Sequence, residues 1–250
     1  MSRNGKTEAS TTGARQPAKV RTSDCRDCLF LNSLQDGGVP ASTVTALCER
    51  MWLNRARRGQ ILYTEGNGAT HLYAIRRGRV KLVKVDFQGR AHVTGILGSG
   101  DLFGFEALFE QTYNSGAEVM EDCELCLASA DHLQLLIEKV PRVATDMAKY
   151  LHAQLSRTRE HQVAANATGA SAKVAAFLLQ AAGENRGGCA DNGVIAAGGL
   201  TLKELGGILG LAHETVCRIL ADLKSRGIVE GLPSGYRIQD VDSLRTISSL

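Results

Sequence analysis

Four neighbouring residues near the C-terminus have side chains that can read the edges of DNA bases: His213, Glu214, Cys217 and Arg218. An arginine can donate a bidentate pair of hydrogen bonds to guanine O6 and N7, and a glutamate can accept a hydrogen bond from cytosine N4. Glu214 and Arg218 are four residues apart, so on a helix they project from one face, one turn from each other. The alternative is a solvated salt bridge between them, which would contribute little. His213 is a candidate for contact with a base or a phosphate.

Two short helices joined by a sharp turn would hold these side chains in place. Thr201 and Glu204 have the Thr-x-x-Glu spacing of a capping box, in which each side chain satisfies a free backbone N–H of the other residue. Gly210 stands where a helix end favours left-handed backbone, and a second helix is expected from about Ala212. The apolar residues of each helix fall on one face, namely Leu202, Leu205, Ile208 and Leu209 in the first and Val216, Ile219, Leu220 and Leu223 in the second.

This pattern indicates a helix-turn-helix, whose second helix enters the major groove of DNA with its first turns on the base edges. Thr201 and Lys203, at the start of the first helix, are candidates for phosphate contacts. Ala212 stands where a Ser or Thr would cap the second helix, and the missing oxygen should cost about 1 kcal/mol of helix stability. The alternative is a helical hairpin that only packs, but the polar face is mixed in sign and rich in base-reading side chains.

Seven cysteines form a second group with chemical potential. Cys25 and Cys28 make a Cys-x-x-Cys pair, and in a reducing compartment such pairs serve metal or redox chemistry more often than structural bridges. Arg26 lies between them, and a neighbouring cation lowers the pKa of a thiol, as a redox switch requires. Cys48 and Cys123 equally suit the role of small buried apolar side chains.

The composition is that of an ordinary globular protein of one large or two modest domains, with 250 residues, 44% hydrophobic, 22% charged and a net charge of +3. No apolar run approaches the roughly 20 residues that span a bilayer. The basic N-terminus lacks the apolar stretch of a secretion signal, so we expect a cytoplasmic protein with no membrane partner. No Ser/His/Asp set, phosphate-binding loop or carboxylate pair can be assembled from the local motifs, so no catalytic residue is assigned and an enzyme is not expected.

Ahead of the two helices the chain changes pattern twice. Residues 1–22 have little to bury and are predicted to be disordered, and a short helix is expected from Pro40 to Met51. Residues 59–128 show short apolar runs between glycines, the pattern of an antiparallel barrel or roll. The expected strands are Gln60–Tyr63, His71–Ile75, Val80–Val85, His92–Ile96, Glu118–Met120 and Leu125–Leu127, with corners at Gly59, Gly66, Gly78, Gly89 and Gly100.

Further helices are expected at 130–138, from Pro141 to about Thr168 and at 171–182, followed by a loop over 183–199 and, after the helix-turn-helix, a hairpin or wing at 228–238. Along the long helix a seam recurs at steps of three and four, namely Met147, Leu151, Leu155, Thr158 and Gln162. Such a seam suits pairing with an identical helix, and a dimer would bind two half-sites at once. The alternative is a helix that lies against its own barrel.

The order of a glycine-cornered roll, a long helix and a winged helix-turn-helix resembles the CRP/FNR family of bacterial transcription regulators. The motifs that carry the resemblance are Gly59–Gln60, His71–Ile75, Gly100–Ala107 and Glu214–Arg218. It implies an α+β fold with a disordered basic tail at 1–22, a cyclic-nucleotide-binding-type β-roll sensor domain with an N-terminal cysteine segment at 23–135, a dimerisation helix at 136–168 and a C-terminal winged helix-turn-helix DNA-binding domain at 169–250.

The resemblance also implies the partners. They are a second copy of the chain, RNA polymerase, and double-stranded DNA with a palindromic operator of TGA-type half-sites, read by Glu214 and Arg218. Cys217 departs from the Gly or Ser that the family usually has at that position, which leaves the spelling of the half-site open.

The resemblance gives two readings of the sensor. Cyclic-AMP receptors of this family hold the cyclic phosphate with an Arg-Ser pair, but the equivalent residues here, 114–116, contain no arginine, and a partly buried phosphate without a counter-charge is unfavourable. The Phe103–Ala107 run is more similar to the FNR branch, whose members hold an oxygen-labile iron–sulfur cluster on three N-terminal cysteines and one from the roll. The function implied is therefore a redox- or oxygen-responsive regulator.

By that resemblance the cluster ligands would be Cys25, Cys28 and Cys126, with Cys48 as the fourth and Cys123 as its alternative. A cluster needs four such ligands, and Cys123 is three residues from Cys126, which places the two on opposite faces of a strand. A thiol switch, a zinc site, and structural cysteines beside another small effector stay open. Haem sensing also occurs in the family, but nothing in the spacing of His71, His92 and His132 nominates an axial pair.

Overall fold

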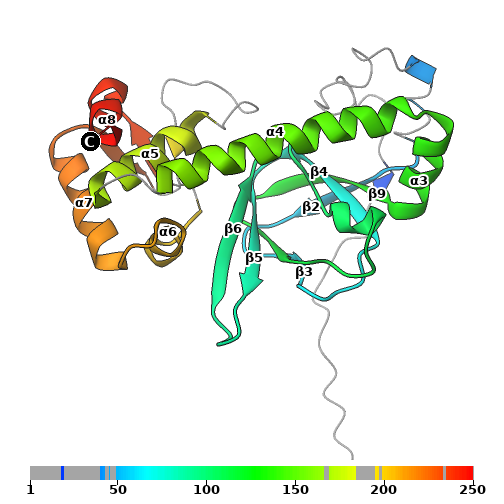
Figure 1. The fold of residues 1–250 in the computed structure, drawn as a ribbon, viewed down its shortest axis with the longest axis horizontal. Helices are drawn as coiled ribbons and strands as arrows, with labels where there is room; N and C mark the ends of the chain where they lie inside the picture. Colours follow the sequence, from blue (N-terminus) through cyan, green and yellow to red (C-terminus); the bar gives the residue numbers. More distant parts are fainter. Residues whose placement is uncertain are drawn as a thin grey trace, which may run out of the picture.

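The computed structural model describes residues 18–19, 40–42, 45, 49–165, 169–183, 195–196, 199–232 and 235–249. Cys25, Cys28 and Cys48 lie outside the described residues, and so do residues 43–44 and 46–47 of the segment in which a helix from Pro40 to Met51 was expected. Within the described part, a β-rich domain and a mainly helical C-terminal domain lie side by side, and one long helix, α4 (Arg142–Ala165), runs along both of them (Figure 1).

Two antiparallel sheets form the β-roll. The first has the strand order β1 (Ala18–Lys19), β2 (Trp52–Ala56), β9 (Cys123–Ser129), β4 (His71–Arg77) and β7 (Leu102–Phe103). The second has the order β3 (Ile61–Tyr63), β8 (Gly116–Val119), β5 (Val80–Val85) and β6 (Ala91–Leu97). A short 3-10 helix, η2 (Phe105–Leu108), follows β7.

The strands confirm the predicted roll and correct it in two places. The five glycines predicted at its corners all have positive φ, between 76° and 93°, the region that glycine enters without a steric cost. Strands β2 and β7 were not predicted. Part of the tail predicted to be disordered also has regular structure, because Ala18 and Lys19 pair with Leu53 and Trp52 of β2.

The period-two alternation of the strands divides the apolar side chains between two clusters. On β4, Tyr73 and Ile75 point into the roll, whereas Leu72 and Ala74 point to the opposite side of the sheet. The outer cluster is covered by α3 (Ala130–Lys139) and by the first turns of α4. The roll is therefore packed on its inside by its own two sheets and on one outer face by helices.

In its described residues, the C-terminal domain contains four helices and a small sheet. Its helices are α5 (Ala170–Gly183), α6 (Leu202–Leu209), α7 (His213–Ser225) and α8 (Val241–Ser248). Its sheet has the order β10 (Ile195–Ala196), β12 (Gly235–Ile238) and β11 (Val229–Leu232). Strands β11 and β12 confirm the predicted wing, whereas β10 and α8 were not predicted.

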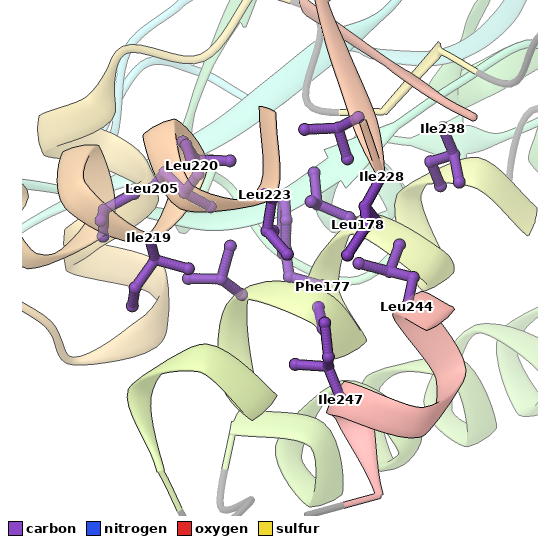
Figure 2. Packing of buried hydrophobic residues seen from close by; sticks show 14 of the residues in the cluster. Phe177, Leu178, Leu205, Ile219, Leu220, Leu223, Ile228, Ile238, Leu244 and Ile247 are labelled. Carbon is purple, nitrogen blue, oxygen red and sulfur yellow. The ribbon is translucent and has the colours of Figure 1, made fainter. Parts of the chain in front are cut away.

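One apolar core joins the helices α5, α6, α7 and α8 with β11 and β12 (Figure 2). Phe177 and Leu178 of α5 lie at its centre, between Leu223 of α7, Ile228 before β11 and Leu244 of α8. Leu178 and Leu244 are fully buried, and burying such side chains contributes about 1.5–3 kcal/mol each. This core fixes α6 and α7 on the rest of the domain.

Candidate nucleic-acid interface

Helix α6 begins at the predicted capping box. The Thr201 hydroxyl accepts a hydrogen bond from the backbone N–H of Glu204 at 3.2 Å, and the Glu204 carboxylate accepts one from the backbone N–H of Thr201 at 2.8 Å. The helix ends at Gly210, whose φ of 65° is left-handed, as predicted. Two backbone donors at the start of the helix are thereby satisfied.

The turn between α6 and α7 depends on a residue that the sequence reasoning missed. A Cβ atom on Gly206 would lie 2.6 Å from the carbonyl oxygen of Leu211, and the backbone N–H of Leu211 donates to the Gly206 carbonyl at 2.9 Å. The chain returns so closely over α6 that only glycine fits there. The Gly206-Gly207 pair inside a predicted helix was the available signal, because glycine there otherwise destabilises a helix.

Helix α7 presents the predicted base-reading residues to solvent. Val216, Ile219, Leu220 and Leu223 form its buried face, and His213, Glu214, Cys217 and Arg218 are all exposed. Ala212 precedes the helix in extended backbone with no side-chain cap. The first turn of α7 therefore keeps free N–H groups beside the exposed polar side chains.

The charged pair on this face is not neutralised internally. The Glu214 carboxylate lies 3.3 Å from Nδ1 of His213, and within the described part of the chain no ion pair joins it to Arg218. Arg218 borders a groove of about 490 Å³ between the start of α5 and α7, with Thr215 and Asp222 on the same side. The guanidinium and the carboxylate are thus both presented to a ligand outside the protein.

The other predicted contacts surround this face. Thr201 and Lys203 are exposed at the start of α6. Helix α7 contacts β11 of the wing. Burial, and after it the Cys217 thiol of α7, raise the pKa of Tyr236 on β12. The structure therefore places the wing beside the helix that carries the predicted reading residues.

Four of the five residues of the predicted dimerisation seam are exposed on α4. Leu151 and Leu155 are 40% and 48% exposed, and Thr158 and Gln162 are exposed beyond them. Met147 is the exception, because it is only 4% exposed and packs in the outer cluster of its own roll. Its place in the seam is therefore corrected, and the surface available to a second copy begins at Leu151.

Cys123 and Cys126 lie on opposite faces of β9, as predicted. Cys123 is buried inside the roll, and Cys126 is buried in the outer cluster, which also contains Met51. Burial is the main cause that raises the pKa of Cys123 to about 12, so the thiol stays protonated at neutral pH. Among the described residues, no three His, Cys, Asp or Glu side chains are grouped so that they could hold a metal ion.

The inside of the roll is filled by aromatic side chains. Tyr63 stacks on Tyr113 with ring centroids 3.7 Å apart, and Tyr73 stacks on Phe103 at 4.8 Å. All four residues are buried. Asn114, at the position expected to hold a cyclic phosphate, donates instead to the Glu110 carboxylate at 2.8 Å. This region offers an anion an acidic neighbour and no arginine.

Comparison with protein families matches both halves of the chain. Residues 53–140 match the cyclic nucleotide-binding domain, and residues 172–247 match the Crp-like helix-turn-helix domain. In the described residues, no helix combines the length and the apolar character that a membrane crossing needs.

Individual relatives match most of the length of the chain. The chain is 25% identical to an anaerobic regulatory protein of Haemophilus influenzae over 75% of this chain and 73% of the relative. It is 28% identical to a CRP-like cAMP-activated global transcriptional regulator of Mycobacterium tuberculosis over 83% and 92%. The solved structure of FixK2 from Bradyrhizobium japonicum has the same fold, with a TM-score of 0.68 and 23% identity over 79% of this chain and 97% of that one.

Proposed function

Since the chain belongs to the CRP/FNR family of transcription regulators and carries its DNA-binding helix-turn-helix, we propose that it is a sequence-specific regulator that binds a palindromic operator as a homodimer. The observation that carries the proposal is the exposed face of α7, where Glu214 and Arg218 stand one turn apart and are not paired with each other. In this role Arg218 donates to a guanine and Glu214 accepts from a cytosine. Acting on chromosomal DNA, such a regulator works in the cytoplasm, with RNA polymerase as its partner.

The exposed seam of α4 supports the homodimer. Leu151 and Leu155 place two large apolar side chains one turn apart on the surface, and a second copy of the helix would bury both. Two recognition helices on one dimer then meet two half-sites, and binding of the first raises the local concentration of the second.

An operator-binding assay tests the readout. Arg218→Ala should weaken binding by about 1–3 kcal/mol and relax the preference for guanine at one position of each half-site. The matched control is Arg226→Ala, which removes the same charge from the end of α7, where Arg226 is paired with Asp222 at 3.3 Å. Fluorescence anisotropy on a duplex selected by the wild-type protein from a randomised pool measures both. An unchanged base preference in Arg218→Ala would refute the assigned role.

We further propose that the signal is redox state or oxygen, sensed through Cys25, Cys28, Cys126 and Cys48. Three observations support it. One relative is an anaerobic regulator by name, the roll interior is filled by aromatic rings, and position 114 faces a carboxylate. The aromatic filling and the acidic neighbour both disfavour the alternative of a cyclic nucleotide bound in the roll.

The structure bears on the choice of the fourth cysteine. Cys126 packs in the same cluster as Met51, three residues after Cys48 in the chain, whereas Cys123 faces the other side of the sheet. An iron–sulfur cluster, when bound, would supply sensitivity to oxygen, because oxygen degrades it. The role of this chain would be to hold it with thiolates, and Cys123 faces the inside of the roll, on the side of β9 opposite to Cys126.

Iron and labile-sulfide analysis of anaerobically purified protein tests this assignment. The expected result is bound iron and sulfide that are lost in Cys126→Ser and retained in Cys123→Ser. Equal loss in both variants would refute the choice of Cys126 over Cys123 as a ligand. Colourless anaerobic wild-type protein without iron would leave the cysteines structural and the effector elsewhere. The DNA-binding assignment would be unaffected by either result.

A further inference from the structure

The outer face of the second sheet of the roll carries a row of three side chains in cross-strand register. Lys81 of β5 pairs with Glu118 of β8 on one side and with Ile96 of β6 on the other. Their neighbours Val80, Val119 and Leu97 point into the roll, so the alternation of each strand turns Lys81, Glu118 and Ile96 outward. We call this row the outer row.

The first helix of the helix-turn-helix sits on the outer row. Helix α6 contacts β6 (Figure 1), and Ile96 packs against the apolar core of the DNA-binding domain. Just before α6, Gly199 lies so close to Met120 that a Cβ would be 2.9 Å from the Met120 carbonyl oxygen. The backbones at Gly199 and Met120 and the side chain of Ile96 therefore bring the two domains into direct contact.

An ion triad centred on the buried Lys81 anchors this contact. The Lys81 ammonium lies 2.6 Å from Glu204 of α6 and 3.0 Å from Glu118, and Lys81 as a whole is 8% exposed. Burial opposes its charge, but the hydrogen bonds to Glu204 and Glu118 outweigh burial, so that the pKa of Lys81 is raised. Removing Lys81 leaves the Glu118 and Glu204 side chains, which are 34% and 24% exposed, without the cation that pairs with both.

The same Glu204 carboxylate also completes the capping box of α6. One oxygen accepts from Lys81, and the other accepts from the backbone N–H and the hydroxyl of Thr201 at 2.8 and 2.9 Å. The group that starts the first helix of the helix-turn-helix is thus bonded directly to a strand of the sensor roll. A displacement of β5 would act on the first turn of α6.

We propose that the outer row is the seat on which the sensor roll holds the helix-turn-helix in the orientation that binds an operator, with the Lys81–Glu204 contact as its anchor. The reading residues of α7 are exposed while α6 is seated, so the seat leaves the DNA-binding face open. Two seated helix-turn-helices in a dimer have a fixed separation, whereas two released ones lose orientational freedom on binding both half-sites. This inference rests on the proposed function only for its effect on operator affinity.

Lys81→Met tests the seat from the side of the roll, without altering the DNA-binding domain. The variant leaves the Glu118 and Glu204 carboxylates facing each other where one ammonium had held both, so their repulsion favours release of α6. The matched control is Lys84→Met, which removes the same charge from an exposed position of the same strand. Glu204→Gln removes the charge of the anchor but keeps an acceptor for the capping box.

Hydrogen exchange followed by mass spectrometry measures the seat directly. In Lys81→Met, the peptides that cover α6 and β6 should exchange faster than in the wild type, whereas Lys84→Met should match the wild type. Operator affinity should fall about tenfold, within the range of couplings between sites in regulatory proteins. The operator affinity of the Lys81→Met, Glu204→Gln double variant should be little lower than that of either single variant, since both substitutions break the same contact.

Each contrary outcome identifies its own error. Exchange in α6 that is the same in Lys81→Met and Lys84→Met would show that the row does not hold the helix. Faster exchange together with tighter operator binding would overturn the proposed orientation, because the seat would then inhibit. If the wild-type protein selected no operator at all, the proposed function would fail while the exchange comparison still decided on the seat. Far-ultraviolet circular dichroism checks that each variant is folded.

Discussion

Replacing Asp101 should weaken the attachment of the long helix α4 to the roll. Three side chains of α4 converge on one oxygen of its carboxylate: the Tyr150 hydroxyl at 3.3 Å, the Gln154 amide at 2.9 Å and the Arg157 guanidinium at 3.0 Å. The second oxygen accepts from the backbone N–H of Gly98 at 2.8 Å. Asp101→Ala removes all four acceptor contacts at once and leaves the donors facing a gap.

The geometry sets the size of the effect. A hydrogen bond to a charged group contributes about 1.5–3 kcal/mol, but the Tyr150 contact is long, and the Arg157 side chain is 40% exposed, so its ion pair contributes about 0–1 kcal/mol. Allowing for both, we expect Asp101→Ala to lower the free energy of unfolding by about 3 kcal/mol. For a protein of this size that is a fall in Tm of about 6–12 °C.

Thermal denaturation followed by circular dichroism measures this loss, with Asp101→Asn as the graded comparison. Asparagine keeps an acceptor oxygen for Gln154 and Tyr150 but loses the charge that holds Arg157, so its Tm should fall between those of Asp101→Ala and the wild type. A further variant, Asp242→Ala, removes a carboxylate that is 93% exposed and should leave Tm unchanged. If Asp101→Ala had the same Tm as Asp242→Ala, the hydrogen bonds that converge on Asp101 would contribute nothing to stability, which would refute the reasoning.

Three other outcomes are expected. Lysines at both Leu151 and Leu155 should convert a dimer to a monomer in analytical ultracentrifugation, whereas Leu135→Lys, at a position 46% exposed on α3, should leave the dimer intact. The pKa of Glu204 is lowered from 4.5, because hydrogen bonds to Lys81 and Thr201 outweigh the opposing effect of burial. The contribution of Glu204 to stability is therefore complete above pH 4.5 and is lost as the pH falls through the lowered pKa. In acid titrations, the free energy of unfolding should decline more steeply for the wild type than for Glu204→Gln. Cys123, whose pKa burial raises to about 12, should resist iodoacetamide at pH 8 in the folded protein and react once it is unfolded, as peptide mapping would show; rapid modification of the folded protein would contradict its burial.

The helix-turn-helix was predictable because its signals are local. The capping box needs two residues three positions apart, and the left-handed end of α6 needs only Gly210. The buried face of α7 follows from helical spacing alone. Each of these features depends on neighbours within one or two turns, so the local sequence is enough to predict it.

Features that depend on distant partners were not predictable in this way. Helical spacing placed Met147 and Leu151 on one seam, but it cannot say which end of α4 lies against the roll of the same chain and which is open to a second copy. Strand β2 has exposed Trp52 at one end and exposed Arg55 near the other, so it lacks the alternation that marks a strand. Its place is set by pairing with β9, about seventy positions on in the chain.

Glu204 makes one contact that the sequence could predict and one that it could not. Its capping role could be predicted from Thr201, three residues away, but its contact with Lys81 spans 123 residues and exists only because the fold places β5 beside α6. The consequence reaches function, because the roll then touches the DNA-binding domain at α6 as well as through the long helix held by Asp101. A signal that moves the β5–β6 side of the roll can act on α6 directly, and one that moves the turn at Asp101 acts through α4. Variants at Lys81 and Asp101 separate these two routes, since the first alters exchange in α6 and the second alters the attachment of α4.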